Sequence, residues 1–358
     1  MRVKSLNINN LRNINSTQID FDPCLNCFIG DNGAGKTSIL EALSVLSKGR
    51  SFRSGQVSSL IGPAKKSFQV VCKIKNRTGD IHQLGMERDA QTWFARHNGE
   101  DVSQLSELTQ LLPYVLLEPN SHTLVSGPPD TRRKYLDWGV FHVEHTYLML
   151  WRRYNRVLKQ RNAALRQANK MVVESLDEQF VHLGERLHIA RDNHAALLNS
   201  ILEKQLSVFC ETLEGVQLSY RKGWAGDSLE EAIQISNTRD IERGSTGPGP
   251  HKADLVLTLN GTPAKERLSR GEQKAMTAAM IIAQAQMISE SGETPVLMLD
   301  DISSELDEVH LGQVLKAGVK LDAQILLTGT VLAPAIKGCE GSCKVFHVKQ
   351  GGVKPITM

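Results

Sequence analysis

Cys27-Phe-Ile-Gly30-Asp-Asn-Gly-Ala-Gly35-Lys-Thr37-Ser-Ile-Leu40 is the stretch that decides the fold of this chain. Its segment Gly30 to Thr37 fits Gly-x4-Gly-Lys-Thr, the pattern of a phosphate-binding loop. The apolar residues before Gly30 predict the end of a buried strand, and the apolar residues after Thr37 recur at helical spacing. A glycine-rich strand–helix turn without a ligand is the alternative, and the complete pattern in this context disfavours it.

Each residue type in this loop has a chemical reason to be there. Glycines let the backbone wrap closely around phosphates, and the following helix points its positive end at the same anion. Lys36 can reach the β- and γ-phosphates, which makes it a candidate catalytic residue, and the Thr37 hydroxyl can ligate Mg²⁺. We therefore expect ATP contacts from Gly30, Asp31, Asn32, Gly33, Ala34, Gly35, Lys36, Thr37 and Ser38.

Composition narrows the class of protein. The chain has 358 residues, 41% hydrophobic and 23% charged, which predicts a water-soluble globular protein of two domains. The net charge of +3 is small, so an anionic polymer must be held by local patches. No apolar run is long enough for a membrane span and no signal segment begins the chain, so we expect a cytoplasmic protein without a membrane partner. Six cysteines are too few for a disulfide framework, although Cys24, Cys27, Cys339 and Cys343 leave a zinc site as an alternative.

Two strands joined by a corner begin the chain, and Arg12 and Asn13 occupy that corner. Alternating residues predict antiparallel strands over 67–75 and 81–96, and 111–117 predicts a buried strand. The corner lies close in sequence to the phosphate loop, so Arg12 and Asn13 are candidate nucleotide contacts. An ordinary exposed turn is the alternative.

Composition changes after Ser126-Gly-Pro-Pro-Asp130, where Asp130 can cap a helix. Two long helices are predicted over 144–172 and 175–213, and they are expected to pair as an antiparallel hairpin. The second carries a coiled-coil-like seam, on which His194 is expected to be a core residue. Apolar positions of the first helix are Trp151, Tyr154, Leu158, Leu165, Ala168 and Val172, and those of the seam are Leu176, Phe180, Leu183, Leu187, Ala190, His194, Leu197 and Ile201.

The first of these helices also carries cations of one sign at helical spacing. Residues 152–170 contain no acid, whereas a helix that serves only solubility normally mixes both signs. A row of cations suits a phosphate backbone, which predicts DNA binding. A solvated face or a patch for an acidic protein is the alternative. The candidate DNA contacts are Arg152, Arg156, Lys159, Arg166 and Lys170, with Arg50 and Arg53 near the phosphate loop as a second group.

Paired carboxylates end a short apolar run near the C-terminus. Asp300 and Asp301 follow Val296 to Leu299, a run typical of a buried parallel strand. A carboxylate at this position near a phosphate loop holds Mg²⁺, and we assign that role to Asp300. Asp301 can orient or deprotonate the attacking water. Because Asp is one methylene shorter than Glu, we expect slow turnover.

The order of these parts resembles the ATPase heads of the ABC class, particularly those of the SMC type. Lys36 and Asp300 lie in opposite thirds of the chain, and Leu268-Ser-Arg-Gly-Glu-Gln273 opens a helix before the acid strand. In such heads the signature residues bind the γ-phosphate of ATP held by a second subunit. The resemblance implies that Ser269, Arg270, Gly271 and Glu272 act across an ATP-dependent homodimer.

The combined motifs resemble the RecF family of bacterial DNA replication and repair proteins along the whole chain. The resemblance implies an ABC-type P-loop ATPase head, with a mixed α/β sheet flanked by helices and an inserted helical second lobe. It implies weak DNA-stimulated ATPase activity, sequence-independent DNA binding, recruitment of RecR and RecO at gaps and stalled forks, and SOS induction. The motifs are Leu11 to Asn13, Gly30 to Thr37, Gly49 to Arg53, Gly127 to Arg133 with Leu136-Asp137, Leu158 to Asn162, Gly249 to Asp254, Leu268 to Gln273, and Asp300 to Asp307.

Three regions and three functional classes follow. The expected regions are 1–126 and 244–358 as halves of the ATPase head, with 127–243 as the helical lobe. An ATP-switched DNA-binding protein is favoured over the ATPase subunit of a membrane transporter and over a monomeric P-loop kinase. The strand after the acid pair ends Leu327-Thr-Gly-Thr330, without the His that many ABC ATPases place there, so Thr328 is a candidate sensor of the γ-phosphate.

Overall fold

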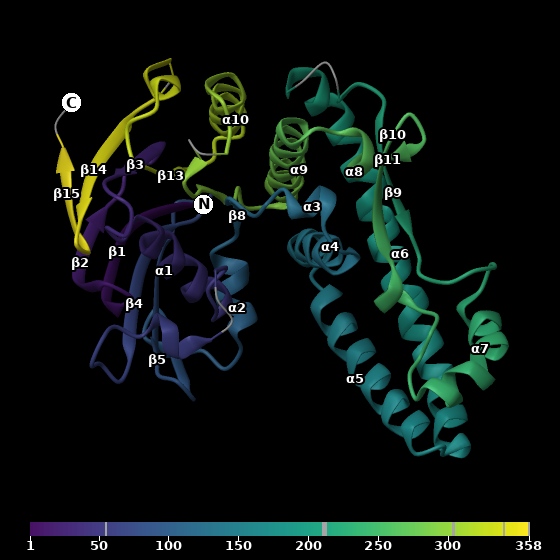
Figure 1. The fold of residues 1–358 in the computed structure, drawn as a ribbon. Coiled ribbons are helices and arrows are strands. Elements are labelled where there is room, and N and C mark those ends of the chain that lie inside the picture. Colours follow the sequence, from purple (N-terminus) through teal and green to yellow (C-terminus); the bar gives the residue numbers. More distant parts are fainter. Residues whose placement is uncertain (54–55, 210–212, 303–304, 339–340, 357–358) are drawn as a thin grey trace. The chain divides into compact units, whose positions relative to one another are not determined.

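A computed structural model describes residues 1–53, 56–209, 213–302, 305–338 and 341–356 (Figure 1). The chain forms two compact units. The first, here called the head unit, joins Met1–Ser121 with Thr277–Met358, and the second, the helical unit, is His122–Met276. The sequence predicts that the helical lobe ends at residue 243, whereas the helical unit of the structure ends at Met276. The signature residues therefore belong to the helical unit.

The head unit contains an antiparallel sheet of six strands in the order β2-β1-β4-β5-β6-β7. It confirms the two N-terminal strands and the strand predicted over 67–75. The strand predicted over 81–96 is divided in two, because the Asp89 carboxylate accepts hydrogen bonds from the backbone N–H groups of Gln91 and Thr92 and closes a turn. The strands are β1 (Arg2–Leu11), β2 (Ile14–Asp20), β4 (Phe68–Lys75), β5 (Ile81–Arg88), β6 (Trp93–His97) and β7 (Glu100–Asp101).

A second sheet of the head unit has the order β15-β14-β3-β13-β12-β8. Its pairs are parallel except for the terminal β14–β15 hairpin, so strands from distant parts of the sequence end at one edge. The strand predicted over 111–117 begins only at Tyr114, because α2 (Leu105–Leu111) extends to Leu111. The strands are β3 (Leu25–Ile29), β8 (Tyr114–Leu117), β12 (Val296–Leu299), β13 (Ile325–Gly329), β14 (Cys343–Lys349) and β15 (Gly352–Ile356).

Helix α1 (Lys36–Lys48) joins the two sheets into one core. Almost every residue along it is buried, and its apolar side chains pack with those of both sheets. Gly49 ends the helix in a left-handed conformation at φ 68°, which glycine adopts without strain. The head unit also contains η1 (Val57–Leu60), the later turns of α9 (Arg270–Ser291), α10 (Glu308–Lys320) and η5 (Pro334–Gly338).

The helical unit consists of helices around a small three-stranded sheet, β11-β10-β9. The sequence predicts loops and a strand over 215–250; the structure has the strand, β9 (Val216–Arg221), and also a helix, α7 (Leu229–Arg243), where a loop is predicted. Asp130 lies in the first turn of α4 and does not cap it, since Pro128 holds that position. The elements are α3 (Thr123–Ser126), α4 (Pro129–Val143), α5 (Tyr147–Arg166), α6 (Lys170–Phe209), β9 (Val216–Arg221), α7 (Leu229–Arg243), η3 (Pro250–Lys252), β10 (Asp254–Leu259), β11 (Thr262–Pro263) and α8 (Ala264–Arg267).

Helices α5 and α6 form the hairpin, but the predicted ends and the predicted buried face of α5 are partly wrong. The break comes at 167–169, where Ala168 adopts φ 51°, so Val172 belongs to α6. Trp151, Ala168 and Val172 are exposed and Leu158 is half-buried. The face buried by α5 is rotated to Tyr147, Tyr154, Val157, Arg161, Ala164 and Leu165.

The seam of α6 is confirmed as far as His194 and then shifts by one residue. Phe180, Leu187 and His194 are buried, and burial lowers the pKa of His194 to about 4. Leu197 is 58% exposed, and burial continues instead through Leu198, Leu202 and Leu206. An α-helix has 3.6 residues per turn, so a seam with a 3.5-residue repeat drifts around the helix. Helix α6 also packs on β9, and this contact accompanies the rotation of its buried face.

Buried arginines hold the helical unit together. Arg161 donates to Asp177 at 2.7 Å and to Asp240 at 3.2 Å, and Arg191 forms a bidentate pair with Asp137. Arg132 and Asp254 form another bidentate pair, at 2.8 and 3.0 Å. Removing one partner of such a buried pair leaves an uncompensated charge. Family motifs around 127–137, 158–162 and 249–254 therefore include residues that stabilise this unit.

Candidate nucleotide-binding site

The phosphate loop connects β3 to α1 at the carboxyl edge of the parallel strands. Gly33 and Gly35 have φ values of 78° and 111°, which glycine adopts without strain. A Cβ on Gly30 would lie 2.2 Å from the carbonyl oxygen of Val348, so only glycine fits there. The loop thus has the backbone that its sequence pattern predicted, with a helix N-terminus facing the space where phosphates would bind.

Side chains inside the loop are held by hydrogen bonds. The Lys36 ammonium is buried and donates to the carbonyl oxygens of Gly30 at 2.7 Å and Asp31 at 3.0 Å. The Asn13 amide donates to the carbonyl oxygen of Gly33 at 2.9 Å, and the Ser38 hydroxyl donates to the Asn13 side chain. The corner of β1 and β2 therefore supports the phosphate loop directly.

Two acidic residues that follow β12 lie next to this loop. The Thr37 hydroxyl donates to Asp300 Oδ1 at 2.8 Å, and the Thr328 hydroxyl donates to the same oxygen at 2.8 Å. Burial raises the pKa of Asp300, and these two hydroxyls oppose the rise. A hydroxyl and a carboxylate that converge in this way are the oxygen ligands that Mg²⁺ prefers. Thr37 and Asp300 would hold the ion.

Thr328 has a different position from the one expected of a γ-phosphate sensor. It is fully buried, and its hydroxyl accepts a hydrogen bond from the backbone N–H of Asp301 at 2.8 Å. It therefore links the two acids and has no exposed atom to offer a phosphate. Asp301 itself is half-buried and adopts φ 47°, which turns the chain away from β12.

Glu118 is a candidate site residue that the sequence prediction missed. It follows β8, whose last residue Leu117 accepts a hydrogen bond from the backbone N–H of Asp300. Burial and the neighbouring Asp300 raise the pKa of Glu118 to about 7. The rule that selected Asp300, an acid at the carboxyl end of a buried strand, also applies to Glu118 and could have found it.

Arg12 is tied to a buried carboxylate beneath the site. It forms a bidentate pair with Glu41 of α1, at 2.7 and 3.1 Å, and the Ser51 hydroxyl donates to the same carboxylate at 2.6 Å. Glu41 is fully buried, so the motifs at 11–13 and 49–53 share one internal anchor. Glu41 is the second residue that the sequence prediction missed, because an acid within an apolar helix carries no local signal of its partners.

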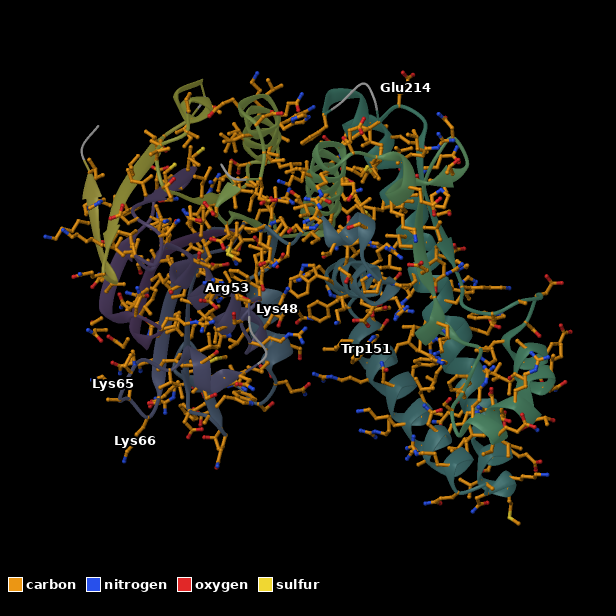
Figure 2. The ribbon with its side chains drawn as sticks, in the orientation of Figure 1. Lys48, Arg53, Lys65, Lys66, Trp151 and Glu214 are labelled. Carbon is orange, nitrogen blue, oxygen red and sulfur yellow. The ribbon has the colours of Figure 1, made fainter. Side chains whose placement is uncertain are left out.

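A cavity of about 830 Å³ opens beside the loop. Its lining brings together Arg12, Asn13, Lys36, Arg53 and Asp301, and it also includes Asn32, Gly33, Gly35, Thr37 and Ser38. Arg53, labelled in Figure 2, had been assigned to DNA together with Arg50. Arg53 lines this cavity, and its guanidinium opposes the raised pKa values of Asp300 and Glu118, so it lies beside the candidate nucleotide site; its contact with DNA stays a prediction. Arg50 is exposed and does not line this cavity.

The signature residues begin α9 in the helical unit. Ser269 precedes the helix and forms a capping box with Glu272: its hydroxyl accepts from the Glu272 N–H at 3.3 Å, and its own N–H donates to Glu272 Oε2 at 2.8 Å. Ser269, Arg270 and Gly271 are exposed, and apart from the adjacent residues and the backbone of α9 itself, no atom of the described residues lies within 4 Å of a Cβ built on Gly271. The helix start is thus ordered and open to an approaching group.

Cations predicted to bind DNA lie on the exposed side of the hairpin. Arg152, Arg156, Lys159 and Arg166 are exposed on α5, and Lys170 is exposed at the start of α6. Arg161, which shares their helix, points inward to Asp177 and Asp240. The one-signed row predicted from the sequence is therefore available to solvent.

Two other expectations concern cysteines and membranes. Among the described residues no group of three or more His, Cys, Asp or Glu side chains could hold a metal ion. Cys27 and Cys343 lie 3.9 Å apart, Sγ to Sγ, and Cys339 lies outside the described residues. No helix within the described parts of the chain combines the length and the apolar character needed to cross a membrane.

Comparison with known proteins places this architecture in a family. The model of the RecF/RecN/SMC N terminal domain matches residues 2–354. The DNA replication and repair protein RecF of Xanthomonas axonopodis pv. citri (strain 306) is 38% identical, with 99% of this chain and 98% of that protein covered. The RecF of Thioalkalivibrio sulfidiphilus (strain HL-EbGR7) is 36% identical over 99% of both chains. This chain belongs to the RecF family.

Solved structures agree with that membership. The structure described as the recombination mediator protein RecF-ATP in the RecFOR pathway superimposes with a TM-score of 0.88 at 25% identity, covering 99% of this chain and 98% of that chain. A Smc head domain from Pyrococcus furiosus, bound to the C-terminal domain of ScpA, gives a TM-score of 0.60 at 14% identity, covering 100% of this chain and 96% of that chain. The ABC-type head fold is thus confirmed, and the RecF relative carries ATP.

Proposed function

We propose that this RecF-family chain is an ATP-switched DNA-binding protein that dimerises around ATP and recruits recombinase-loading partners. The observation that carries the proposal is the open helix start at Ser269–Glu272, described above, which leaves Gly271 uncovered. The phosphate loop, the acids and the basic side chains of the head unit supply one half of an ATP site. An exposed signature helix from a second copy would supply the other half.

The residues of the head unit suit slow hydrolysis. With ATP in place, Lys36 would turn from the carbonyls of Gly30 and Asp31 to the phosphates, and Thr37 and Asp300 would hold Mg²⁺, which neutralises phosphate charge. Asp301 would orient the attacking water, and its short side chain limits the rate. Asp301→Asn would then bind ATP and remain dimeric, because binding does not need the acid. Turnover would time release from DNA.

DNA binding is assigned to the exposed cations of the hairpin. Each of the five can meet one phosphate, and such contacts carry no base information. Because phosphate contacts do not depend on base identity, binding without sequence preference is part of this proposal. In this proposal the protein acts in the cytoplasm at gaps and stalled forks, recruits RecR and RecO, and contributes to SOS induction. Family membership supports these roles.

Sedimentation velocity of the full chain, with and without ATP and gapped DNA, tests the proposal. The expected result is a monomer without ATP, a dimer with ATP and Mg²⁺, and a dimer–DNA complex when both are present. A monomer under every condition would contradict the composite site and favour a monomeric kinase. Co-fractionation with membranes would favour a transporter ATPase.

A further inference from the structure

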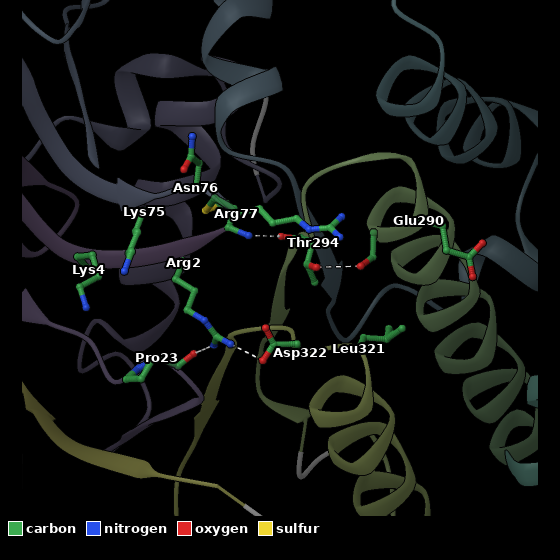
Figure 3. Close-up of a pocket in the computed structure, with 12 residues that line it drawn as sticks. Arg2, Lys4, Pro23, Lys75, Asn76, Arg77, Glu290, Thr294, Leu321 and Asp322 are labelled. Carbon is green, nitrogen blue, oxygen red and sulfur yellow. Dashed lines mark hydrogen bonds and ion pairs between the residues drawn. The ribbon is translucent and has the colours of Figure 1, made fainter. Parts of the chain in front are cut away.

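A second large cavity lies in the head unit, at the opposite edge of the parallel sheet from the phosphate loop. It has a volume of about 750 Å³ and is drawn in Figure 3. Pro23, Thr294 and Asp322 line it, and each precedes a parallel strand: β3, β12 or β13. The other wall comes from the paired ends of β1 and β4. No residue of the nucleotide site takes part.

The backbone of β1 concentrates cations on this wall. Arg2 and Lys75 are direct partners in the β1–β4 register, so two like charges face each other across neighbouring strands. Such a pair is destabilising unless an anion neutralises it. The register then shifts between Val3 and Ser5, and Lys4 lies in that β-bulge. Bulges re-aim side chains, and Lys4 joins the other two in the lining.

Only part of this positive charge is neutralised within the chain. Arg2 is ion-paired with Asp322 and also donates to the carbonyl oxygen of Pro23. Glu290 accepts a hydrogen bond from Gln286, and Figure 3 shows its carboxylate turned away from the cavity. Lys4 and Lys75 are exposed, and their ammonium groups have no hydrogen-bond or ion-pair partner among the described residues. The cavity therefore presents two uncompensated ammonium groups beside a third cation, Arg77.

We propose that this cavity docks an acidic, extended segment of a partner protein, whose carboxylates pair with Lys4 and Lys75. The volume is in the range of ligand pockets and these cations line it, so a short peptide can enter. Ser289 and Thr294, whose hydroxyls bond to each other at 2.8 Å, add polar groups to the wall. The inference rests on the proposed recruitment of partners and names a surface and a chemistry for one of them.

Nucleic acid fits this cavity less well. Proteins that hold single strands combine cations with aromatic side chains on which bases stack. The described residues that line this cavity include no aromatic side chain. A duplex needs a row of cations along an open surface, which α5 provides and a cavity of this kind does not.

Fluorescence anisotropy with the full chain tests the proposal, with fluorescein-labelled hexaglutamate as the probe and hexaglutamine as the uncharged comparison. Wild-type protein should bind hexaglutamate and not hexaglutamine. Lys4→Glu/Lys75→Glu should weaken hexaglutamate binding about tenfold or more, because like charges would then meet. Lys4→Gln/Lys75→Gln should give an intermediate loss. The matched control is Lys65→Glu/Lys66→Glu, which changes the net charge equally on side chains that extend into solvent (Figure 2).

The proposal would be overturned if wild-type protein did not bind hexaglutamate, or if the test and control variants lost equal affinity. It would also be overturned if Lys4→Glu/Lys75→Glu lost binding to a short single-stranded oligonucleotide but still bound hexaglutamate. Sedimentation with ATP and gapped DNA on the same proteins separates this inference from the proposed function. If the test variant dimerises on DNA normally, a failure concerns the docking cavity alone.

Discussion

The phosphate loop in the head unit and the signature helix start in the helical unit differ in how completely their own chain surrounds them. Around the loop, hydrogen bonds hold the side chains of Asn13 and Lys36 to loop carbonyls and that of Thr37 to Asp300. Gly30 packs closely against the backbone of β14. Around the helix start, Ser269 forms hydrogen bonds within the described parts of the chain only to Glu272 and Gln273 in the first turn of α9, and a Cβ on Gly271 would meet no neighbouring element there.

That difference is informative because both segments are ordered. A capping box fixes the signature helix start without help from neighbours, so its exposure is a property of the folded chain. A preorganised helix N-terminus is suited to an anion brought from outside. In the proposed function, the head unit supplies the phosphate loop and a second copy of the chain brings its ATP to the signature.

Lys36→Met should have the largest effect, because it removes the ammonium group of the phosphate loop. It leaves the carbonyls of Gly30 and Asp31 without their donor, and the phosphates without a cation. We expect ATP affinity to fall at least about tenfold and ATP-dependent dimerisation to be lost. Equilibrium binding of a fluorescent ATP analogue and sedimentation measure the two effects. The exposed Lys65→Met is the control, and unchanged dimerisation of Lys36→Met would contradict the ATP-sandwich proposal.

Ser269→Arg tests the exposed signature helix start. The arginine fills the space before α9, so the dimer should be lost while ATP affinity stays within about twofold of wild type. Ser269→Ala is the matched control, since it loses the capping hydrogen bond, worth about 1 kcal/mol, without adding bulk. Wild-type dimerisation and ATPase activity in Ser269→Arg would show that the signature has no role across an interface.

Arg156→Glu/Lys159→Glu tests the exposed cations of the same unit. Five phosphate contacts predict that log affinity for duplex DNA falls with log salt at a slope of about −4.5, and losing two should reduce the slope to about −2.7. Arg239→Glu/Arg243→Glu on α7 changes the charge equally at exposed positions. Filter binding across a salt series measures the slopes. If the two variants behave alike, DNA binds elsewhere.

Glu118→Gln should have the smallest effect and concerns the head unit. Since the pKa of Glu118 is raised from 4.5 to about 7, the folded protein holds this proton more tightly than the unfolded chain does. The free energy of unfolding should therefore fall as pH rises between these values, and the variant should lose about 1 kcal/mol or less of that pH dependence. Urea unfolding at several pH values measures it, with the exposed Glu100→Gln as control. An unchanged pH profile would contradict the raised pKa.

Local patterns predicted the strands and helices that enclose the nucleotide site. Gly30 to Thr37, the run before Asp300 and the segment opening α9 each encode their conformation within a few consecutive residues. The hairpin was harder. Trp151 and Leu197 fit a helical repeat but are exposed, because the buried face of a helix depends on its neighbours. Helix α7 was missed since its apolar residues are sparse and Ile235 is exposed.

Partners far apart in sequence could not be read from either residue alone. Glu41 is an acid within an apolar helix, and its partners Arg12 and Ser51 are identified only by the structure. Arg53 belongs to a short basic segment, and only the structure shows that acids lie near it. The charged cavity at the other edge of the sheet also depends on pairing, because the β1–β4 register places Lys75 opposite Arg2 and puts Lys4 in the neighbouring bulge.

The sequence by itself predicted a phosphate loop, an acid pair at a strand end and a helix start at the signature, because glycine conformation, strand ends and helix starts are local properties. Tertiary structure alone decided which side chains surround the phosphates, which face of the hairpin is exposed, and that the signature helix start is left open. Those outcomes depend on contacts between segments separated by tens to hundreds of residues, and no short pattern encodes them.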